Sequence, residues 1–68
     1  MIVTLNGERR ELADGATVAS AVAALGVPAG ARGVAVAVDG EVVRRGAWEE
    51  TTLAPFARVE VLTAIQGG

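Results

Sequence analysis

Arg58-Val59-Glu60-Val61-Leu62-Thr63 is the last apolar run of the chain, and it alternates as a β-strand does. Val59 and Val61 would share one face of a sheet, because successive side chains of a strand point to opposite sides. Leu62 would lie on the other face, which is exposed if only one side of the sheet is covered. The rest of the chain must then supply the neighbouring strands and the covering layer.

Two predicted hairpins precede this run. Asn6-Gly7 and Asp39-Gly40 mark their turns, because both central positions of a type I′ turn need positive φ, which these residue types tolerate. In the segment Val34-Ala35-Val36-Ala37-Val38, valine alternates with alanine, so the valine face is expected to pack on the covering layer. The predicted strand pairs are 2–5 with 8–12 and 34–38 with 41–43.

One helix is predicted between the hairpins. Thr17 is a good N-cap for residues 18–25, in which apolar side chains recur at helical spacing. Gly26 suits the left-handed position after a helix, and Pro28 prevents the helix from continuing. The helix therefore has defined ends and an apolar stripe that can cover a sheet.

The fold class that follows is α+β, with a mixed sheet of four to five strands packed on one helix. These patterns do not fix the strand order. If 58–63 lies between the two hairpins, the arrangement is the ubiquitin-like β-grasp. Residues 44–56 form an irregular connection with a short helical turn near Trp48. We expect one domain over 1–64 and a flexible C-terminal tail over 65–68.

The composition of the chain excludes several function classes. Its 68 residues include no Cys and no His, which leaves no disulfide and no thiolate or imidazole metal site. A net charge of −2 and two aromatic residues argue against nucleic-acid binding. No run reaches the roughly 20 apolar residues of a membrane span, and no signal peptide is recognisable. We expect a cytoplasmic protein that binds neither nucleic acid nor membrane.

The sequence closes with Gln66-Gly67-Gly68. A Gly-Gly end presents its α-carboxylate on a stalk without side chains, which fits an enzyme slot too narrow for other residues. The Gly68 carboxylate is therefore the candidate reactive group. All six basic residues are Arg. We favour codon bias as the reason, and the alternative, that a carrier with an activated C-terminus avoids internal amines, stays open.

Taken in order, these elements resemble the ThiS family, within the ThiS/MoaD group of ubiquitin-like sulfur carriers. The resemblance is strong because it covers nearly the whole chain. Three departures are visible: Asp39 stands in place of Asn, Arg44 in place of Pro, and Phe56-Ala57 in place of a Gly-Asp turn. The matching segments are 1–7, Thr17-Val18, 33–39, Val42-Val43 followed by Arg45 and Trp48, and 58–62 leading to Gln66-Gly67-Gly68.

The resemblance implies a protein co-substrate rather than an enzyme, with no cofactor of its own. A ThiF-like adenylyltransferase would use ATP and Mg²⁺ to join Gly68 to AMP. A sulfur donor, such as a cysteine desulfurase or a rhodanese-type protein, would then displace AMP. The product is a terminal thiocarboxylate (1-thioglycine at Gly68), whose sulfur passes to thiazole synthase in thiamine biosynthesis.

Further residues are candidates for binding these partners. Ile65, Gln66 and Gly67 are expected to form the tail that the partners hold. Leu62 and Arg45 are a possible docking patch. Three other functions stay open: the same carrier chemistry for molybdopterin or tRNA thiolation, a ubiquitin-like protein modifier, and an interaction module such as a TGS domain.

Overall fold

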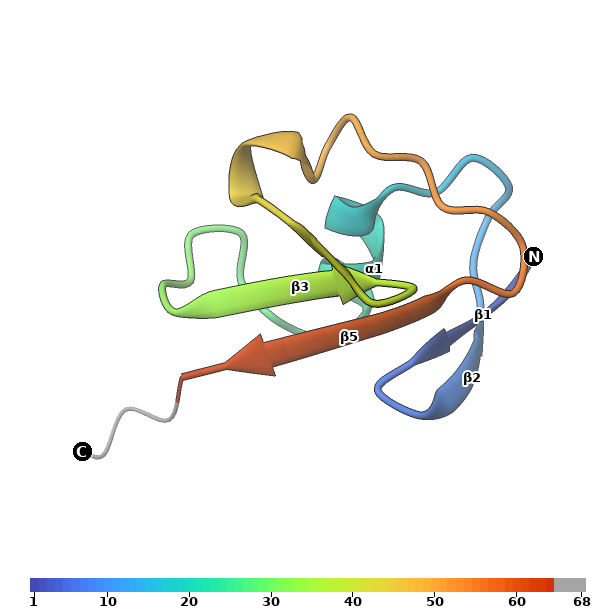
Figure 1. The fold of residues 1–68 in the computed structure, drawn as a ribbon, viewed down its shortest axis with the longest axis horizontal. Helices are drawn as coiled ribbons and strands as arrows, with labels where there is room; N and C mark the ends of the chain where they lie inside the picture. The colour runs from blue at the N-terminus through green and yellow to red at the C-terminus, as the bar shows by residue number, and fades with distance from the viewer. Residues whose placement is uncertain (65–68) are drawn as a thin grey trace.

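The computed structural model describes residues 1–64 of the chain (Figure 1). The predicted tail, residues 65–68, lies outside the described residues. In chain order the elements are β1 (Ile2–Leu5), β2 (Glu8–Glu11), α1 (Val18–Ala24), β3 (Val34–Val38), β4 (Glu41–Val43), the 3-10 helix η1 (Arg45–Ala47) and β5 (Arg58–Thr63).

The five strands form one mixed sheet in the order β2-β1-β5-β3-β4. β5 runs parallel to β1, with Leu5 opposite Val59, and antiparallel to β3, with Val36 opposite Val61. The last strand therefore lies between the two hairpins (Figure 1). This placement confirms the ubiquitin-like β-grasp prediction and settles the strand order that the sequence patterns left open.

Helix α1 follows the predicted signals closely. The hydroxyl of its N-cap, Thr17, accepts a hydrogen bond from the Ser20 amide, and the Ser20 hydroxyl accepts one from the Thr17 amide in return. This reciprocal capping satisfies two amides that the first turn leaves without helical partners. The helix ends at Ala24, one residue before the predicted end, and Gly26 adopts a φ of +82° just beyond it.

The helix covers one face of the sheet, and the apolar core lies between them. Val3, Val36 and Val59 come from three adjacent strands and are almost fully buried. Strand β2 also contributes to this side, because Arg10 is paired with Val3 and its guanidinium donates to the Ala24 carbonyl at the end of α1. The main buried cluster is Val3, Leu5, Val18, Ala21, Val22, Val36, Trp48, Leu53, Ala57, Val59 and Val61.

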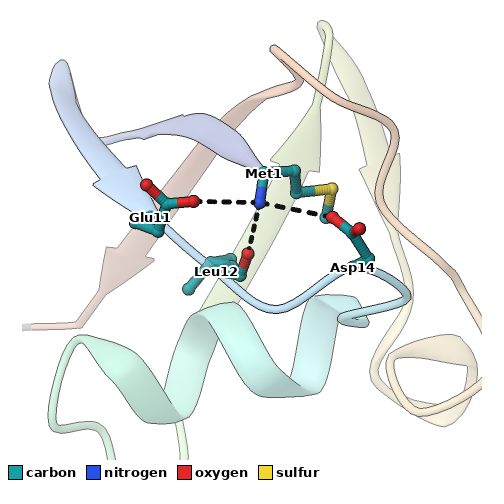
Figure 2. Close-up of polar contacts among 4 residues, drawn as sticks. All are labelled: Met1, Glu11, Leu12 and Asp14. Carbon is teal, nitrogen blue, oxygen red and sulfur yellow. Dashed lines mark hydrogen bonds and ion pairs between the residues drawn. The ribbon is translucent and has the colours of Figure 1, made fainter.

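The start of β1 is fastened to the end of β2 through the chain's own ammonium group (Figure 2). The Met1 ammonium donates to Glu11 at 3.2 Å and to the Leu12 carbonyl at 2.6 Å, and it lies 3.3 Å from Asp14. The hydrogen bond to Glu11 raises the pKa of this ammonium; partial burial opposes the rise, and Asp14 adds to it. The ammonium therefore stays protonated to a higher pH than usual.

No helix among residues 1–64 is long and apolar enough to cross a membrane. Phe56, in the turn before β5, takes a φ of +66° and is 79% exposed. Its amide donates to the Ile2 carbonyl, and the Ala57 amide donates to Ala54. The turn before β5 is thus built without the glycine that such a φ favours.

Candidate functional site

The candidate site is the region where β5 ends, because the predicted reactive segment continues from it. Ile65, Gln66, Gly67 and Gly68 lie outside the described residues. The described part of the site consists of Ala64, the sheet face beside it and the loop against it. In Figure 1, β5 ends on the side of the molecule opposite the N-terminus, where the loop between α1 and β3 also lies.

Ala64 is held by one further rung of the β3–β5 ladder. Its amide donates to the Gly33 carbonyl at 2.7 Å, immediately beyond the pairing of Val34 with Thr63. Gly33 has a φ of +69°, and a Cβ added there would lie 2.8 Å from the Cβ of Ala64. Both the backbone conformation and the space therefore require glycine at position 33.

Arg45, predicted as a possible docking residue, has a different set of contacts. Its guanidinium donates to the Ala29 carbonyl at 2.8 Å and also to the Ala31 carbonyl. The same group lies 4.8 Å from the centre of the Trp48 ring, a cation–π distance. The fork of Arg45 thus ties the loop that precedes β3 to a buried aromatic side chain.

The indole of Trp48, over which the Arg45 guanidinium lies, is itself held in place. Trp48 is buried in the core, and its Nε1–H donates to the Val43 carbonyl at 2.8 Å.

Leu62, by contrast, points to the sheet face that α1 does not cover, since its strand neighbours Val61 and Thr63 point the other way. The structure therefore does not bring Arg45 and Leu62 together into one patch.

The uncovered sheet face carries a shallow, mostly apolar groove around Leu62. Leu62 and Val42 are 71% and 80% exposed and stand on either side of β3, where the small side chains of Ala35 and Ala37 leave room between them. The residues that line the groove are Ala35, Val36, Ala37, Val42, Glu60 and Leu62.

Val42 and the two alanines were not predicted as part of the site. The alternation of valine and alanine over residues 34–38 already indicated that one face of this strand carries only small side chains, those of Ala35 and Ala37. Recognising Val42 also required the hairpin register that places it opposite Ala37. Among residues 1–64, no group of three or more His, Cys, Asp or Glu residues could hold a metal ion.

Comparison with known proteins identifies the family. The ThiS family model matches residues 3–68, which is nearly the whole chain. The chain belongs to the ThiS family. This match extends through Gly67 and Gly68, so the segment that follows β5 is part of the ThiS sequence pattern.

Two solved structures from Geobacter metallireducens resemble the chain along its full length. One is a crystal structure of the thiamine biosynthesis protein ThiS, with 36% identity, a TM-score of 0.78 and complete coverage of both chains. The other is a solution NMR structure of a thiamine biosynthesis protein, with 34% identity and a TM-score of 0.79, covering all of this chain and 88% of the other. No curated protein sequence matches significantly. ThiS membership and the observed sheet order agree on the β-grasp fold.

Proposed function

We propose that this protein is a sulfur carrier in thiamine biosynthesis and that the Gly68 carboxylate is its reactive group. The observation that supports this most strongly is the family match, which includes both glycines at the end of the sequence. The full-length similarity to the Geobacter metallireducens proteins supports the same pathway. The protein acts as a co-substrate in the cytoplasm, and its partners supply the catalytic groups.

The proposed chemistry overcomes the low reactivity of a free carboxylate. A free carboxylate resists nucleophiles because its leaving group is poor. In the proposed first step, a Gly68 carboxylate oxygen attacks the α-phosphorus of Mg²⁺-bound ATP and pyrophosphate leaves, which gives a mixed anhydride with AMP. A sulfur nucleophile at the oxidation level of sulfide then attacks the carbonyl carbon and AMP leaves. The resulting thiocarboxylate passes its sulfur to thiazole synthase.

The uncovered sheet face suits the docking of these partners. Its groove is apolar, lies next to the strand from which the reactive segment continues, and carries one carboxylate, that of Glu60. Apolar side chains of a partner would displace water from Leu62 and Val42, and this is the main source of affinity in protein interfaces. Glu60 would favour a basic or hydrogen-bonding group at the edge of the contact.

The direct test is reaction with a ThiF-like adenylyltransferase, ATP, Mg²⁺ and sulfide, followed by intact-mass spectrometry with fragmentation. We expect one oxygen to be replaced by sulfur, and the change to be located at Gly68. Modification at another residue would contradict the carrier function. So would the absence of any modification by adenylyltransferases that are shown to be active on their own carriers.

The variant Gly67→Val tests whether the end of the sequence is read as a stalk without side chains. Position 67 follows β5, which ends at Thr63, so the stability should change by less than about 0.5 kcal/mol. Adenylation should fall about a hundredfold, because a branched side chain next to the reacting residue displaces the carboxylate from the phosphate. A thermal melt and ATP–pyrophosphate exchange measure the two effects, and normal exchange would refute the proposal.

The docking face has its own test. Leu62→Glu should raise the KM for the carrier in adenylation by about tenfold with kcat unchanged, since the loss of an apolar anchor weakens binding. Ala23→Glu is the matched control, because Ala23 is exposed on α1 and the charge change is the same. Equal KM values for the two variants would exclude this face as the docking surface.

A further inference from the structure

The loop between α1 and β3 has two parts. Leu25 and Val27 pack against the core, whereas residues 28–33 have few contacts that hold their shape. Ala29, Gly30 and Gly33 are exposed and have small side chains or none. Within the loop, the Ala31 amide donates to the Pro28 carbonyl at 3.0 Å. A segment with so few buried contacts opens at low free-energy cost unless it is fastened from outside.

Arg45 provides that fastening. Its planar guanidinium presents several N–H groups in a fixed fork, which here bind the carbonyls of Ala29 and Ala31 at the same time. The guanidinium also lies over the ring of Trp48, which is buried and whose Nε1–H donates to the Val43 carbonyl. The side chain of Arg45 therefore fixes the position of the loop relative to the buried ring of Trp48.

The Ala31 carbonyl, which Arg45 binds, and Gly33 are separated in the sequence by one residue, Arg32. Gly33 in turn accepts the Ala64 amide and leaves no room for a Cβ beside Ala64. A continuous path of contacts thus runs from Trp48 to Ala64, through Arg45 and Gly33. Ala64 is the residue from which the reactive segment continues.

We propose that Arg45 is a positioning residue, which acts through the 29–33 loop and Gly33 to set the direction in which the chain leaves the sheet at Ala64. This inference rests on the proposed function. The direction of the chain at Ala64 matters because the Gly68 carboxylate must reach the α-phosphate of ATP in line. Arg45 touches none of the reacting atoms. Its contribution is to the geometry of the docked complex, not to docking itself.

The first experiment reads this geometry without any partner. Amide hydrogen exchange by NMR should show the Ala64 amide of Arg45→Ala exchanging about five to ten times faster than in the unchanged protein, as expected for a weakened hydrogen bond. The control is Arg44→Ala, because Arg44 is also an exposed arginine and makes no side-chain capping bond to η1. An unchanged Ala64 amide in Arg45→Ala would overturn the proposal.

The second experiment separates positioning from docking in the adenylation reaction. Arg45→Ala should lower kcat at least about tenfold with less than a twofold change in the KM for the carrier, since small displacements cost rate and the sheet face is intact. Leu62→Glu should show the opposite split. If kcat of Arg45→Ala equals that of Arg44→Ala, Arg45 has no positioning role.

Two further variants test the same path of contacts, and a thermal melt of each checks that it is folded. Arg45→Lys keeps a cation over Trp48 but lacks the fork, so its kcat should be intermediate. Gly33→Ala disturbs Ala64 from the other side without touching Arg45, and should lower kcat in the same way. If the unchanged protein is not adenylated at all, the proposed function fails, whereas the exchange result at Ala64 still tests the positioning path.

Discussion

The first hairpin turns at Asn6 and Gly7, with φ values of 49° and 85°, and the second turns at Asp39 and Gly40, with 49° and 86°. The central residues of the two turns have nearly the same φ values, yet their side chains form different hydrogen bonds to β5. The Asn6 amide group donates to the Val61 carbonyl at 3.1 Å and accepts from the Val61 amide at 2.7 Å. The Asp39 carboxylate accepts one hydrogen bond, from the Arg58 amide at 2.9 Å, while the Asp39 backbone amide donates to the Arg58 carbonyl at 2.8 Å.

The difference explains how β5 is held between its neighbours. Strand β1 ends at Leu5, and the carboxamide of Asn6 then takes the place of one more backbone unit beside β5. On the other side β3 pairs with β5 down to Val59, and the Asp39 backbone amide already donates to the Arg58 carbonyl. The Asp39 side chain therefore needs only to accept the Arg58 amide. Asparagine is therefore required at the first turn, where both a donor and an acceptor are used, but not at the second.

The largest effect should come from exchanging the two side-chain types. Asn6→Asp loses the donor to the Val61 carbonyl and places a carboxylate against it, which should lower the free energy of unfolding by about 1–3 kcal/mol. Asp39→Asn keeps the acceptor and should change it by less than about 0.5 kcal/mol. Urea unfolding of both variants measures the difference. Equal losses would mean that the side chains of the two turns are interchangeable.

A smaller effect is expected at Phe56, the third non-glycine residue with positive φ among residues 1–64. Unlike Asn6 and Asp39, phenylalanine has no side-chain hydrogen bond to compensate for this conformation, and its ring is largely exposed. Phe56→Asn should therefore raise the free energy of unfolding by about 0.5–1 kcal/mol, because Asn tolerates the left-handed region. Urea unfolding that showed a loss instead would mean that the exposed ring stabilises the turn.

The smallest effect should be that of pH on the first hairpin, where the Met1 ammonium bonds to Glu11 at the open end of the strand pair. The pKa of this ammonium is raised on folding, so its stabilisation is complete below its ordinary value of 8.0 and is lost as the pH rises through the folded value. The chain has no Lys, Tyr or Cys, the side chains whose ordinary pKa values lie between about 8 and 11.

Urea unfolding of the 68-residue chain at neutral and alkaline pH measures this step. We expect stability to fall across the window in the unchanged protein and to stay level in an N-acetylated form, which has no ammonium to titrate. A fall of the same size in the acetylated protein would assign the pH dependence to another cause.

Some of the site could have been predicted from the sequence, and some could not. The exposure of Leu62 follows from alternation along β5, and the small side chains beside it follow from the Val-Ala alternation of β3. Arg45 shows the limit of such reasoning, because a charged residue in an irregular segment gives no indication of its partners. Its bonds are to carbonyls 14 and 16 residues away, and only the folded chain places them within reach.

The sequence by itself determined the local structure: the Asn6-Gly7 and Asp39-Gly40 turns, the helix between Thr17 and Gly26, and the division of valine and alanine between the faces of β3. These features depend on the conformational preferences of neighbouring residues and on the period of apolar side chains. The tertiary structure alone decided that β5 lies between β1 and β3, that Asn6 completes its ladder 55 residues along the chain, and that Arg45 fastens the loop beside Ala64. Strand order and such bonds depend on contacts between distant segments, which exist only once the helix and sheet have packed.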